Sequence, residues 1–311
     1  MGVAAVLASG FVAIAAVPQV LFGSGAEPWP DLAPVPVVTH ASAPQGRCGL
    51  PAQVLDLTDW KVTLPVPKPD SAKSPLEVTQ PTLAGFAQAP WFRLSPTCDA
   101  VLFRAPVNGT TTSGSKYPRS ELREMTDNGS ENAGWSSTAG THRLSVTEAF
   151  VRLPTGKAEL VGAQIHDADD DISVFRLEGS KLWITDGDNP HFKLITDHYA
   201  LGTRFDAGYE VSDGEVRAYY NGVLQTTIKH RFRGAYFKAG AYTQANCTNS
   251  APCSADNYGE TMIYGLSVFH QVTTWQLVWD WIVAWAPVGI GVLVLLILGV
   301  VLVRRLRSRR A

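Results

Sequence analysis

Outside one apolar stretch near its C-terminal end, this sequence of 311 residues lacks long runs with helical periodicity, and it has no internal repeat. Apolar and polar residues instead alternate over short segments, as they do in β-strands. With 45% hydrophobic and 10% aromatic residues, the chain is long enough to bury one core of roughly 200 to 250 residues. This composition excludes a disordered chain and a small disulfide scaffold.

Basic residues are in short supply once the C-terminal end is set aside. All five charges after residue 303 are arginines and residues 1–26 carry none, so residues 27–303 hold 21 basic and 28 acidic residues, a net charge of −7. This balance argues against nucleic-acid binding through a broad basic surface. An anionic ligand would need a local basic groove that works against the overall field.

The four cysteines lack the CxxC spacing and the paired histidines of a zinc site, and we predict no metal. An even number of cysteines in an exported domain indicates disulfides instead. Cys247 and Cys253 are close enough to close a local loop, which leaves Cys48 to pair with Cys98, although the sequence alone permits two other pairings. The acidic run at 167–171 lacks the pattern of a calcium loop and is more typical of a solvated loop.

No charge interrupts residues 282–303, which would span about 33 Å as a helix and match the hydrocarbon core of a membrane. We predict a transmembrane helix there, preceded by an aromatic juxtamembrane segment at 271–281. The arginines of 304–311 place this tail in the cytoplasm and the preceding domain outside the cell. A buried core helix is the alternative, but such helices rarely run this long without a polar face.

The N-terminal segment 1–26 is largely apolar but has no lysine or arginine before its apolar run, the usual start of a signal peptide. Small residues at Ser24-Gly25-Ala26 offer a cleavage site, and an uncleaved anchor is the competing interpretation. Five prolines within 27–47 predict an extended linker. Whether the N-terminal segment is cleaved or retained, the domain at 48–270 is delivered across the membrane. We expect a single-pass cell-membrane protein.

Several segments of this domain have the alternation of β-strands. They are Leu55–Pro65, which ends at proline, and Arg143–Val151, Ser173–Leu177, Lys181–Thr185 and Tyr209–Val211. Arg217–Tyr220 and Val223–Ile228 flank Asn221-Gly222, a strong signal for a two-residue hairpin turn. We therefore predict an all-β fold, a sandwich or β-jelly roll in which one curved sheet offers a concave groove.

Three further segments carry polar or ionisable side chains at every second position: Tyr117–Arg123, Gln164–His166 and Tyr236–Gln244. Alternate residues of a strand face the same side, so each segment presents one polar face. The faces comprise Arg119, Glu121 and Arg123, then Gln164 and His166, then Lys238, Tyr242 and Gln244. A groove lined by them suits an anionic sugar whose carboxylate must be neutralised while a neighbouring proton is removed.

The same segments resemble the ordered signature of the alginate lyases of polysaccharide lyase family seven. The resemblance covers roughly residues 50–270 and is carried by Leu-Asp-Leu-Thr-Asp-Trp-Lys-Val-Thr-Leu-Pro from Leu55, Tyr-Pro-Arg-Ser-Glu-Leu-Arg from Tyr117, Gln-Ile-His from Gln164, Tyr-Phe-Lys-Ala-Gly-Ala-Tyr-Thr-Gln from Tyr236 and Ile-Tyr-Gly-Leu-Ser-Val from Ile263. It implies a monomeric β-jelly roll that cleaves alginate by β-elimination, without a metal or an organic cofactor.

β-Elimination of a 4-linked uronate removes the proton on C5 and expels the oxygen on C4. The resemblance assigns neutralisation of the uronate carboxylate to Arg119 and Gln164, and His166 could hydrogen-bond the same group. Tyr242 can protonate the leaving oxygen, while His166 or an ionised Tyr242 takes the C5 proton. We predict that the four remaining polar residues contact the substrate, namely Glu121, Arg123, Lys238 and Gln244. Glu121 and Arg123 could instead mainly orient Arg119.

The geometry of the sugar bears on which residue is the base. In guluronate the C5 proton and the C4 oxygen lie on opposite sides, which favours two catalysts, whereas in mannuronate they share a side and Tyr242 could perform both steps. Isoleucine between Gln164 and His166 tends, in the family, to accompany activity on guluronate-containing blocks. We therefore expect an endo-acting alginate lyase that favours guluronate-containing blocks.

Simpler interpretations remain for each residue and for the whole domain. The charged residues of Tyr117–Arg123 would form a charge ladder on a solvated sheet, His166 would be a structural histidine, and Tyr242 would be a packing residue. The same elimination could act on another polyuronate such as glucuronan. A surface jelly roll that binds carbohydrate without cutting it is the alternative from another class, but it would need no phenol and imidazole at these spacings.

Overall fold

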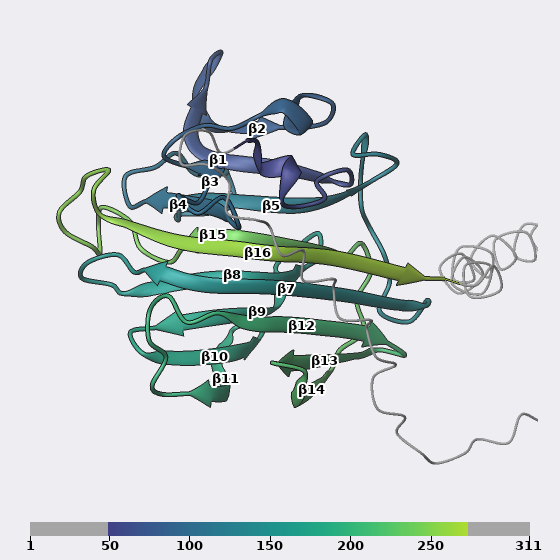
Figure 1. Ribbon diagram of the computed structural model, residues 1–311. Coiled ribbons are helices and arrows are strands. Elements are labelled where there is room, and N and C mark those ends of the chain that lie inside the picture. Colours follow the sequence, from purple (N-terminus) through teal and green to yellow (C-terminus); the bar gives the residue numbers. More distant parts are fainter. Residues whose placement is uncertain (1–48, 273–311) are drawn as a thin grey trace, which may run out of the picture. The chain divides into compact units, whose positions relative to one another are not determined.

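The computed structural model describes residues 49–272, which form two antiparallel β-sheets lying face to face (Figure 1). Sheet A contains, in spatial order, β11 (Asn189–Thr196), β10 (Lys181–Asp186), β9 (Asp171–Glu178), β8 (Glu159–His166), β15 (Tyr236–Thr243), β5 (Arg119–Thr126), β1 (Trp60–Lys68) and β2 (Ser71–Val78), with β6 (Glu131–Asn132) paired to β5. Sheet B contains β14 (Val223–Lys229), β13 (Glu215–Tyr220), β12 (Phe205–Ser212), β7 (Thr141–Arg152), β16 (Tyr258–Gln271), β4 (Val101–Pro106) and β3 (Phe92–Leu94). Two short 3-10 helices are η1 (Pro51–Gln53) and η2 (Thr82–Gly85). The predicted all-β sandwich is confirmed, and the two sheets are consistent with a jelly roll.

Several predicted features lie outside the described residues. They are the N-terminal segment 1–26, the linker 27–47, residues 273–281 of the juxtamembrane segment, the predicted transmembrane helix 282–303, the tail 304–311, and Cys48 with its predicted bond to Cys98. Between residues 49 and 272, neither helix has the length and apolar character needed to cross a membrane.

The predicted strands are present, but both boundaries of the first were placed wrongly. The Asn221-Gly222 turn joins β13 to β14, and both residues have positive φ (50° and 76°), as a turn matching the twist of a hairpin requires. The strand expected to run from Leu55 to Pro65 instead begins at Trp60 and continues to Lys68. Its register against β2 shifts between Leu64 and Pro67, and proline is tolerated at such an irregularity.

The hydrophobic core fills the space between the sheets. Its largest fully buried side chains are Tyr209, Phe92, Phe103, Phe150, Phe175, Phe205, Phe237, Leu55, Leu64, Leu83, Leu102 and Leu122. In β5, Leu122 belongs to this core, so its neighbours Glu121 and Arg123 face away from it. A slip of one residue would bury these charges between the sheets and expose Leu122, and the core therefore determines which face of sheet A is polar.

One carboxyl group lies inside the core. Glu148 of β7 is fully buried, its Oε1 accepts a hydrogen bond from the backbone N–H of Ala163 at 3.3 Å, and its Oε2 has no partner in the described part of the chain. Gly162 permits this contact, because a Cβ there would lie 2.6 Å from both carboxyl oxygens. Burial raises the pKa of Glu148 to about 8, so the group is protonated at neutral pH.

Glu148→Gln should remove a loss of stability that occurs as pH rises from about 4.5 to about 8. The unfolded carboxyl releases its proton near pH 4.5, whereas the folded one keeps it until about pH 8. The wild type therefore loses stability as pH rises through this window, and the amide, which does not titrate, does not. In urea unfolding, the free energy of unfolding of the variant relative to that of the wild type should increase from pH 5 to pH 8. Glu131→Gln, on the exposed β6, is the control, and the same offset at both pH values would contradict the buried, protonated state.

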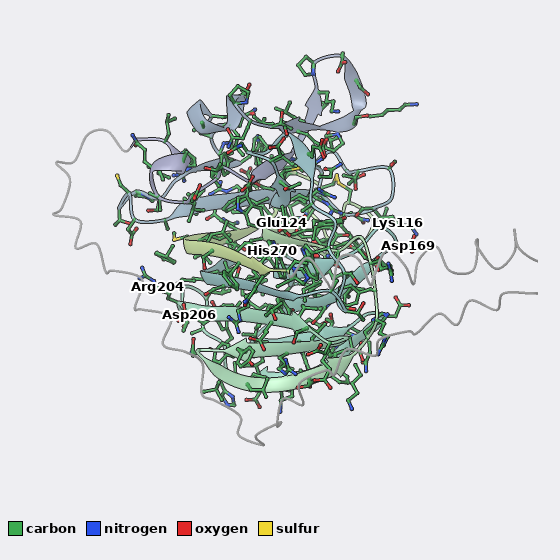
Figure 2. The ribbon with its side chains drawn as sticks, turned by 90° about the vertical axis from the view of Figure 1, so that its right-hand side faces the viewer. Lys116, Glu124, Asp169, Arg204, Asp206 and His270 are labelled. Atoms are coloured by element: carbon green, nitrogen blue, oxygen red, sulfur yellow. A yellow bond between two sulfur atoms is a disulfide. The ribbon has the colours of Figure 1, made fainter. Side chains whose placement is uncertain are left out.

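A second polar cluster connects the two sheets. Glu124 of β5 pairs with Nε2 of His270 in β16, and Figure 2 shows these two side chains together between the sheets. Nδ1 of His270 lies 2.7 Å from Nδ1 of His142. Nε2 of His142 faces the carbonyl oxygens of Ser136 and Ala139, which only accept, so it carries the proton and Nδ1 accepts from His270. Burial, reinforced by His270, lowers the pKa of His142 to about 4, so this ring stays neutral.

Candidate functional site

The polar faces of the three predicted strands meet on the outer face of sheet A, because β15 pairs with β5 on one side and with β8 on the other. A groove of about 360 Å³ lies over them. Seven of the eight predicted site residues line it, namely Arg119, Glu121, Arg123, Gln164, His166, Lys238 and Tyr242. Gln244 lines an adjoining pocket that shares Gln164, Asp171 and Tyr242 with the groove. The structure thus brings together residues that are far apart along the chain.

Strand register determines which of these residues face each other. Lys238 is opposite Arg123 on one side and Gln164 on the other, while Tyr242 is opposite Arg119. Cross-strand neighbours of this kind lie within side-chain contact. The groove therefore has one row of Arg123, Lys238 and Gln164 and a second row of Arg119 and Tyr242.

Glycine is required between the two rows. Gly240 is opposite Glu121, has a φ of 150°, and leaves no room for a side chain. A Cβ at this position would lie 2.5 Å from the carbonyl oxygen of Ser120 and 2.7 Å from the Cα of Glu121. The missing side chain lets β15 approach β5 and leaves space for the carboxylate of Glu121 on the groove side.

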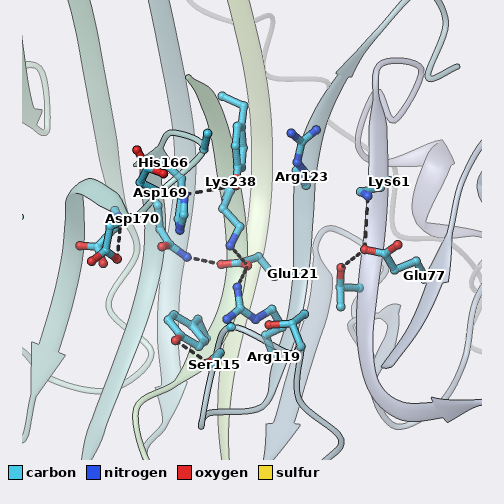
Figure 3. Close-up of a pocket in the computed structure, with 18 residues that line it drawn as sticks. Lys61, Glu77, Ser115, Arg119, Glu121, Arg123, His166, Asp169, Asp170 and Lys238 are labelled. Carbon is cyan, nitrogen blue, oxygen red and sulfur yellow. Dashed lines mark hydrogen bonds and ion pairs between the residues drawn. The ribbon is translucent and has the colours of Figure 1, made fainter. Parts of the chain in front are cut away.

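The carboxylate of Glu121 lies at the floor of the groove and contacts three other groove residues. Its side chain is 1% exposed, and its Oε2 lies 2.6 Å from Nζ of Lys238 and 3.4 Å from Nη1 of Arg119 (Figure 3). Its Oε1 accepts a hydrogen bond from Nε2 of Gln164, which fixes the orientation of that amide because a carboxylate cannot donate. Its carboxylate thus has three protein partners, and its predicted contact with the substrate stays a prediction.

Four cationic side chains line the groove, namely Lys61, Arg119, Arg123 and Lys238, together with five acidic ones. Lys238 is buried, which lowers its pKa to about 8 against the opposing effect of Glu121, so most molecules carry its charge at neutral pH. Arg123 donates from Nη1 to Asn132 at 2.7 Å and lies 3.8 Å over the ring of Tyr236. Figure 3 places Arg123 between Lys238 and Lys61, so cations extend across neighbouring strands. These cations can pair with the carboxylates of an anionic polymer.

His166 has one ring nitrogen available to a ligand. Its Nδ1 lies 2.6 Å from the carbonyl oxygen of Asp167, which only accepts, and 3.1 Å from the hydroxyl of Tyr236, which can accept as well as donate. Both contacts are satisfied when Nδ1 carries the proton. Its Nε2 has no hydrogen-bond partner within residues 49–272 and keeps its lone pair. Burial, followed by the charge of Lys238, lowers the pKa of His166, so the imidazole is neutral near pH 7. His166 is therefore suited to accept a proton at Nε2.

Along the strands, the phenol of Tyr242 lies on the opposite side of Glu121 from His166. Its hydroxyl oxygen is 2.9 Å from Oγ of Ser115, and the guanidinium of Arg119 lies 4.1 Å from the centre of its ring. The sequence-based prediction missed Ser115, because this residue lies in an irregular segment without alternation. It also missed Asp171, the first residue of β9, which lines both pockets and whose pKa is raised to about 6 by burial and by Asp170.

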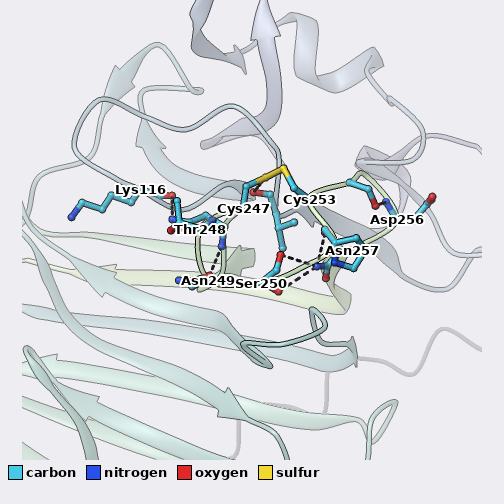
Figure 4. Close-up of a disulfide and its surroundings, with 12 residues drawn as sticks. Lys116, Cys247, Thr248, Asn249, Ser250, Cys253, Asp256 and Asn257 are labelled. Atoms are coloured by element: carbon cyan, nitrogen blue, oxygen red, sulfur yellow. Dashed lines mark hydrogen bonds between the residues drawn. A yellow bond between two sulfur atoms is a disulfide. The ribbon is translucent and has the colours of Figure 1, made fainter.

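A disulfide loop supports the segment that carries Ser115. The predicted Cys247–Cys253 bond is confirmed and closes a short loop after β15 (Figure 4). Directly before Cys247, Nδ2 of Asn246 donates to the carbonyl oxygen of Lys116 at 3.1 Å. The disulfide therefore braces the groove from outside it.

Comparisons with known proteins agree with this site. A family model described as alginate lyase matches residues 55–270. The alginate lyase from Corynebacterium sp. is 59% identical, with a TM-score of 0.70 over 73% of this chain and 100% of that chain. AlgAT5, an alginate lyase from polysaccharide lyase family 7, is 43% identical, with a TM-score of 0.67 over 72% and 99%. An alginate lyase from Klebsiella pneumoniae is 35% identical over 77 residues, and the match spans 24% of that relative. The predicted family is confirmed: this chain belongs to the alginate lyases of polysaccharide lyase family 7, and it is a polysaccharide lyase.

Proposed function

We propose that this lyase cleaves alginate within the polymer by β-elimination, favours guluronate-containing blocks, and releases unsaturated oligosaccharides. The observation that carries the proposal is the convergence, around one groove lined by four cations, of a neutral imidazole with a free Nε2 and a phenol. These are the two proton carriers that elimination of a uronate needs.

Arg119 and Gln164 neutralise the carboxylate of the sugar that is cleaved. Removing the C5 proton adds negative charge beside this carboxylate, and hydrogen bonds from a guanidinium and an amide stabilise the resulting enolate-like state. Glu121 accepts from Nη1 of Arg119 and from Nε2 of Gln164, so the other terminal N–H groups of these side chains can contact the sugar. Since these donors are held before the substrate arrives, little reorganisation accompanies the reaction.

His166 removes the C5 proton and Tyr242 protonates the oxygen on C4. The two residues lie on different strands, with Lys238 and Gln164 in the row that separates them. Two separate proton carriers suit guluronate, in which the proton and the leaving oxygen are on opposite sides. Ile165 is fully buried in the core, so any preference associated with it acts through the position of β8 and not through contact with the sugar.

The extent of the groove supports internal cleavage. The pocket that contains Gln244 continues beyond Gln164 and Tyr242, so sugar units can lie on both sides of the reacting one. Lys61 and Arg123 extend the positive charge in the other direction. A groove that continues past the reacting sugar in both directions accepts a polymer in its middle.

The purified full chain should be mixed separately with polyguluronate, polymannuronate, mixed alginate and glucuronan. Elimination creates a conjugated double bond, so we expect ultraviolet absorbance to rise fastest with polyguluronate and products to range over several lengths early in the reaction. Release of monomers from the start would contradict endo action. Absorbance only with glucuronan would identify another polyuronate as the substrate, and binding without absorbance would identify a non-catalytic module.

Arg119→Ala should lower kcat/KM for polyguluronate by about 10²–10³-fold, the usual loss on removing one donor to a developing oxyanion. Both a higher KM and a lower kcat are expected, because the guanidinium contacts the carboxylate before and during the reaction. Initial rates from ultraviolet absorbance measure both constants. Arg204→Ala is the control, since this exposed arginine lies away from the groove residue Asp169 (Figure 2). An unchanged rate would remove Arg119 from the carboxylate site.

We further propose that residues 282–303 anchor the enzyme in the cell membrane, with its catalytic domain outside and as a monomer. The uncharged run and the arginines after it support this orientation. The full chain should stay with membranes after washing at alkaline pH, and protease added to intact cells should release the domain. Recovery in the wash, or protection from protease, would contradict the proposal.

A further inference from the structure

Ser115 lies where it can control the hydroxyl of Tyr242. It belongs to the segment between β4 and β5, lines the groove, and places its Oγ 2.9 Å from the phenolic oxygen. No other hydrogen-bond partner of the Tyr242 hydroxyl is found in residues 49–272. The orientation of the phenolic hydrogen in the resting enzyme therefore depends on Ser115.

The hydrogen bonds of Ser115 allow two arrangements. The backbone N–H of Tyr117 donates to Oγ at 3.0 Å, so this lone pair is occupied in both. The hydroxyl hydrogen of Ser115 then has two acceptors, the carbonyl oxygen of Tyr117 at 3.2 Å and the phenolic oxygen of Tyr242. In the first arrangement the phenol donates to Ser115. In the second, Ser115 donates to the phenol and turns the phenolic hydrogen toward the groove.

We propose that Ser115 is a positioning residue for Tyr242, donating its hydroxyl hydrogen to the phenolic oxygen so that the phenol delivers its own proton to the leaving group. This role rests on the proposed role of Tyr242 as the acid. A hydrogen bond to an ionised acceptor is stronger than one to a neutral acceptor, so Ser115 stabilises the phenolate more than the phenol. The interaction therefore strengthens as the proton leaves.

The complete step balances within the site. Nε2 of His166 takes the C5 proton, the electrons of the C5–H bond form the C4–C5 double bond, and the C4–O bond breaks. The leaving oxygen takes the proton of Tyr242, which becomes a phenolate held by Ser115 and by the charge of Arg119. The imidazolium and the phenolate then return to their neutral forms by proton exchange with water. No oxidant, reductant or other co-reactant is needed.

The fold holds Ser115 in place from the side away from the substrate. The carbonyl oxygen of Lys116 accepts from Asn246, and the hydroxyl of Tyr117 accepts from Nδ2 of Asn249 at 3.4 Å. Both asparagines belong to the segment braced by the Cys247–Cys253 disulfide. The serine is thus positioned before any sugar binds, which is what a group that orients another requires.

Ser115→Ala should lower kcat for polyguluronate about 10- to 100-fold and leave KM within about twofold, because the serine acts on the proton transfer and not on carboxylate binding. Ser115→Thr keeps a hydroxyl and should recover most of the lost rate. Ser113→Ala, an exposed serine in the same segment, is the matched control and should behave as the wild type. Thermal unfolding of all three variants shows whether the segment remains folded.

The outcomes separate this role from the proposed function. If Ser115→Ala keeps the wild-type kcat while Tyr242→Phe is inactive, the function stands and the role of Ser115 is wrong. The same holds if Ser115→Thr loses as much rate as Ser115→Ala, or if the loss appears in KM alone. If Tyr242→Phe keeps the wild-type rate, Tyr242 is not the acid, and the proposed mechanism fails together with the role of Ser115.

Discussion

Tyr242→Phe is expected to lower kcat for polyguluronate by about 10²–10⁴-fold, the contribution that one positioned proton carrier makes to a reaction. The substitution removes only the hydroxyl, so the ring can still pack under the guanidinium of Arg119, which lies 4.1 Å from its centre. The groove keeps all its cations, and the affinity for the polymer should change by less than about twofold. Ultraviolet absorbance measures the turnover, and calorimetric titration with polyguluronate measures the binding.

Tyr264→Phe is the matched control for this experiment. Its hydroxyl contacts the sulfur of Met262 in sheet B, away from the groove, so both turnover and binding should match the wild type. Equal losses of binding and turnover in Tyr242→Phe would show that the phenol holds the sugar without transferring a proton. A near wild-type rate would leave the leaving oxygen without an identified acid.

The faces of the site strands could be predicted from the sequence, whereas their neighbours could not. Alternation requires Lys238 and Tyr242 to share a face, and the structure places both on the groove. No pattern within β8, β15 or β5 indicates that these three strands lie side by side, because strand order depends on packing across the whole sandwich. The expectation that these three segments meet in one groove came from the family resemblance.

How deeply each side chain lies in the groove also could not be predicted from the sequence. Alternation places Glu121 on the same face as Arg119, but it does not say how far a carboxylate lies below its neighbours. The absence of a side chain at Gly240, directly opposite, leaves room for the carboxylate beneath the cations. Ser115 was missed for a different reason, since an irregular segment has no period from which a facing direction can be inferred.

The position of Glu121 leads to the second large effect, which we expect from Glu121→Gln. The amide keeps the size of the side chain but removes the charge shared by Lys238 and Arg119, so two cations are left close together without a buried counter-charge. Breaking a buried ion pair on one side typically costs about 3–5 kcal/mol of stability. We also expect kcat/KM to fall at least 10²-fold, since Arg119 and the amide of Gln164 lose their support.

Urea unfolding at pH 7 and initial rates with polyguluronate test both effects, with Glu77→Gln as the control. Glu77 pairs with Lys61 at 3.2 Å in the more exposed part of the groove, where a lost ion pair should cost less than about 1 kcal/mol. If Glu121 touched the sugar directly, its substitution would raise KM and leave the free energy of unfolding close to that of the wild type. A large loss of stability together with a low kcat would instead show that this carboxylate works by holding the residues that do touch it.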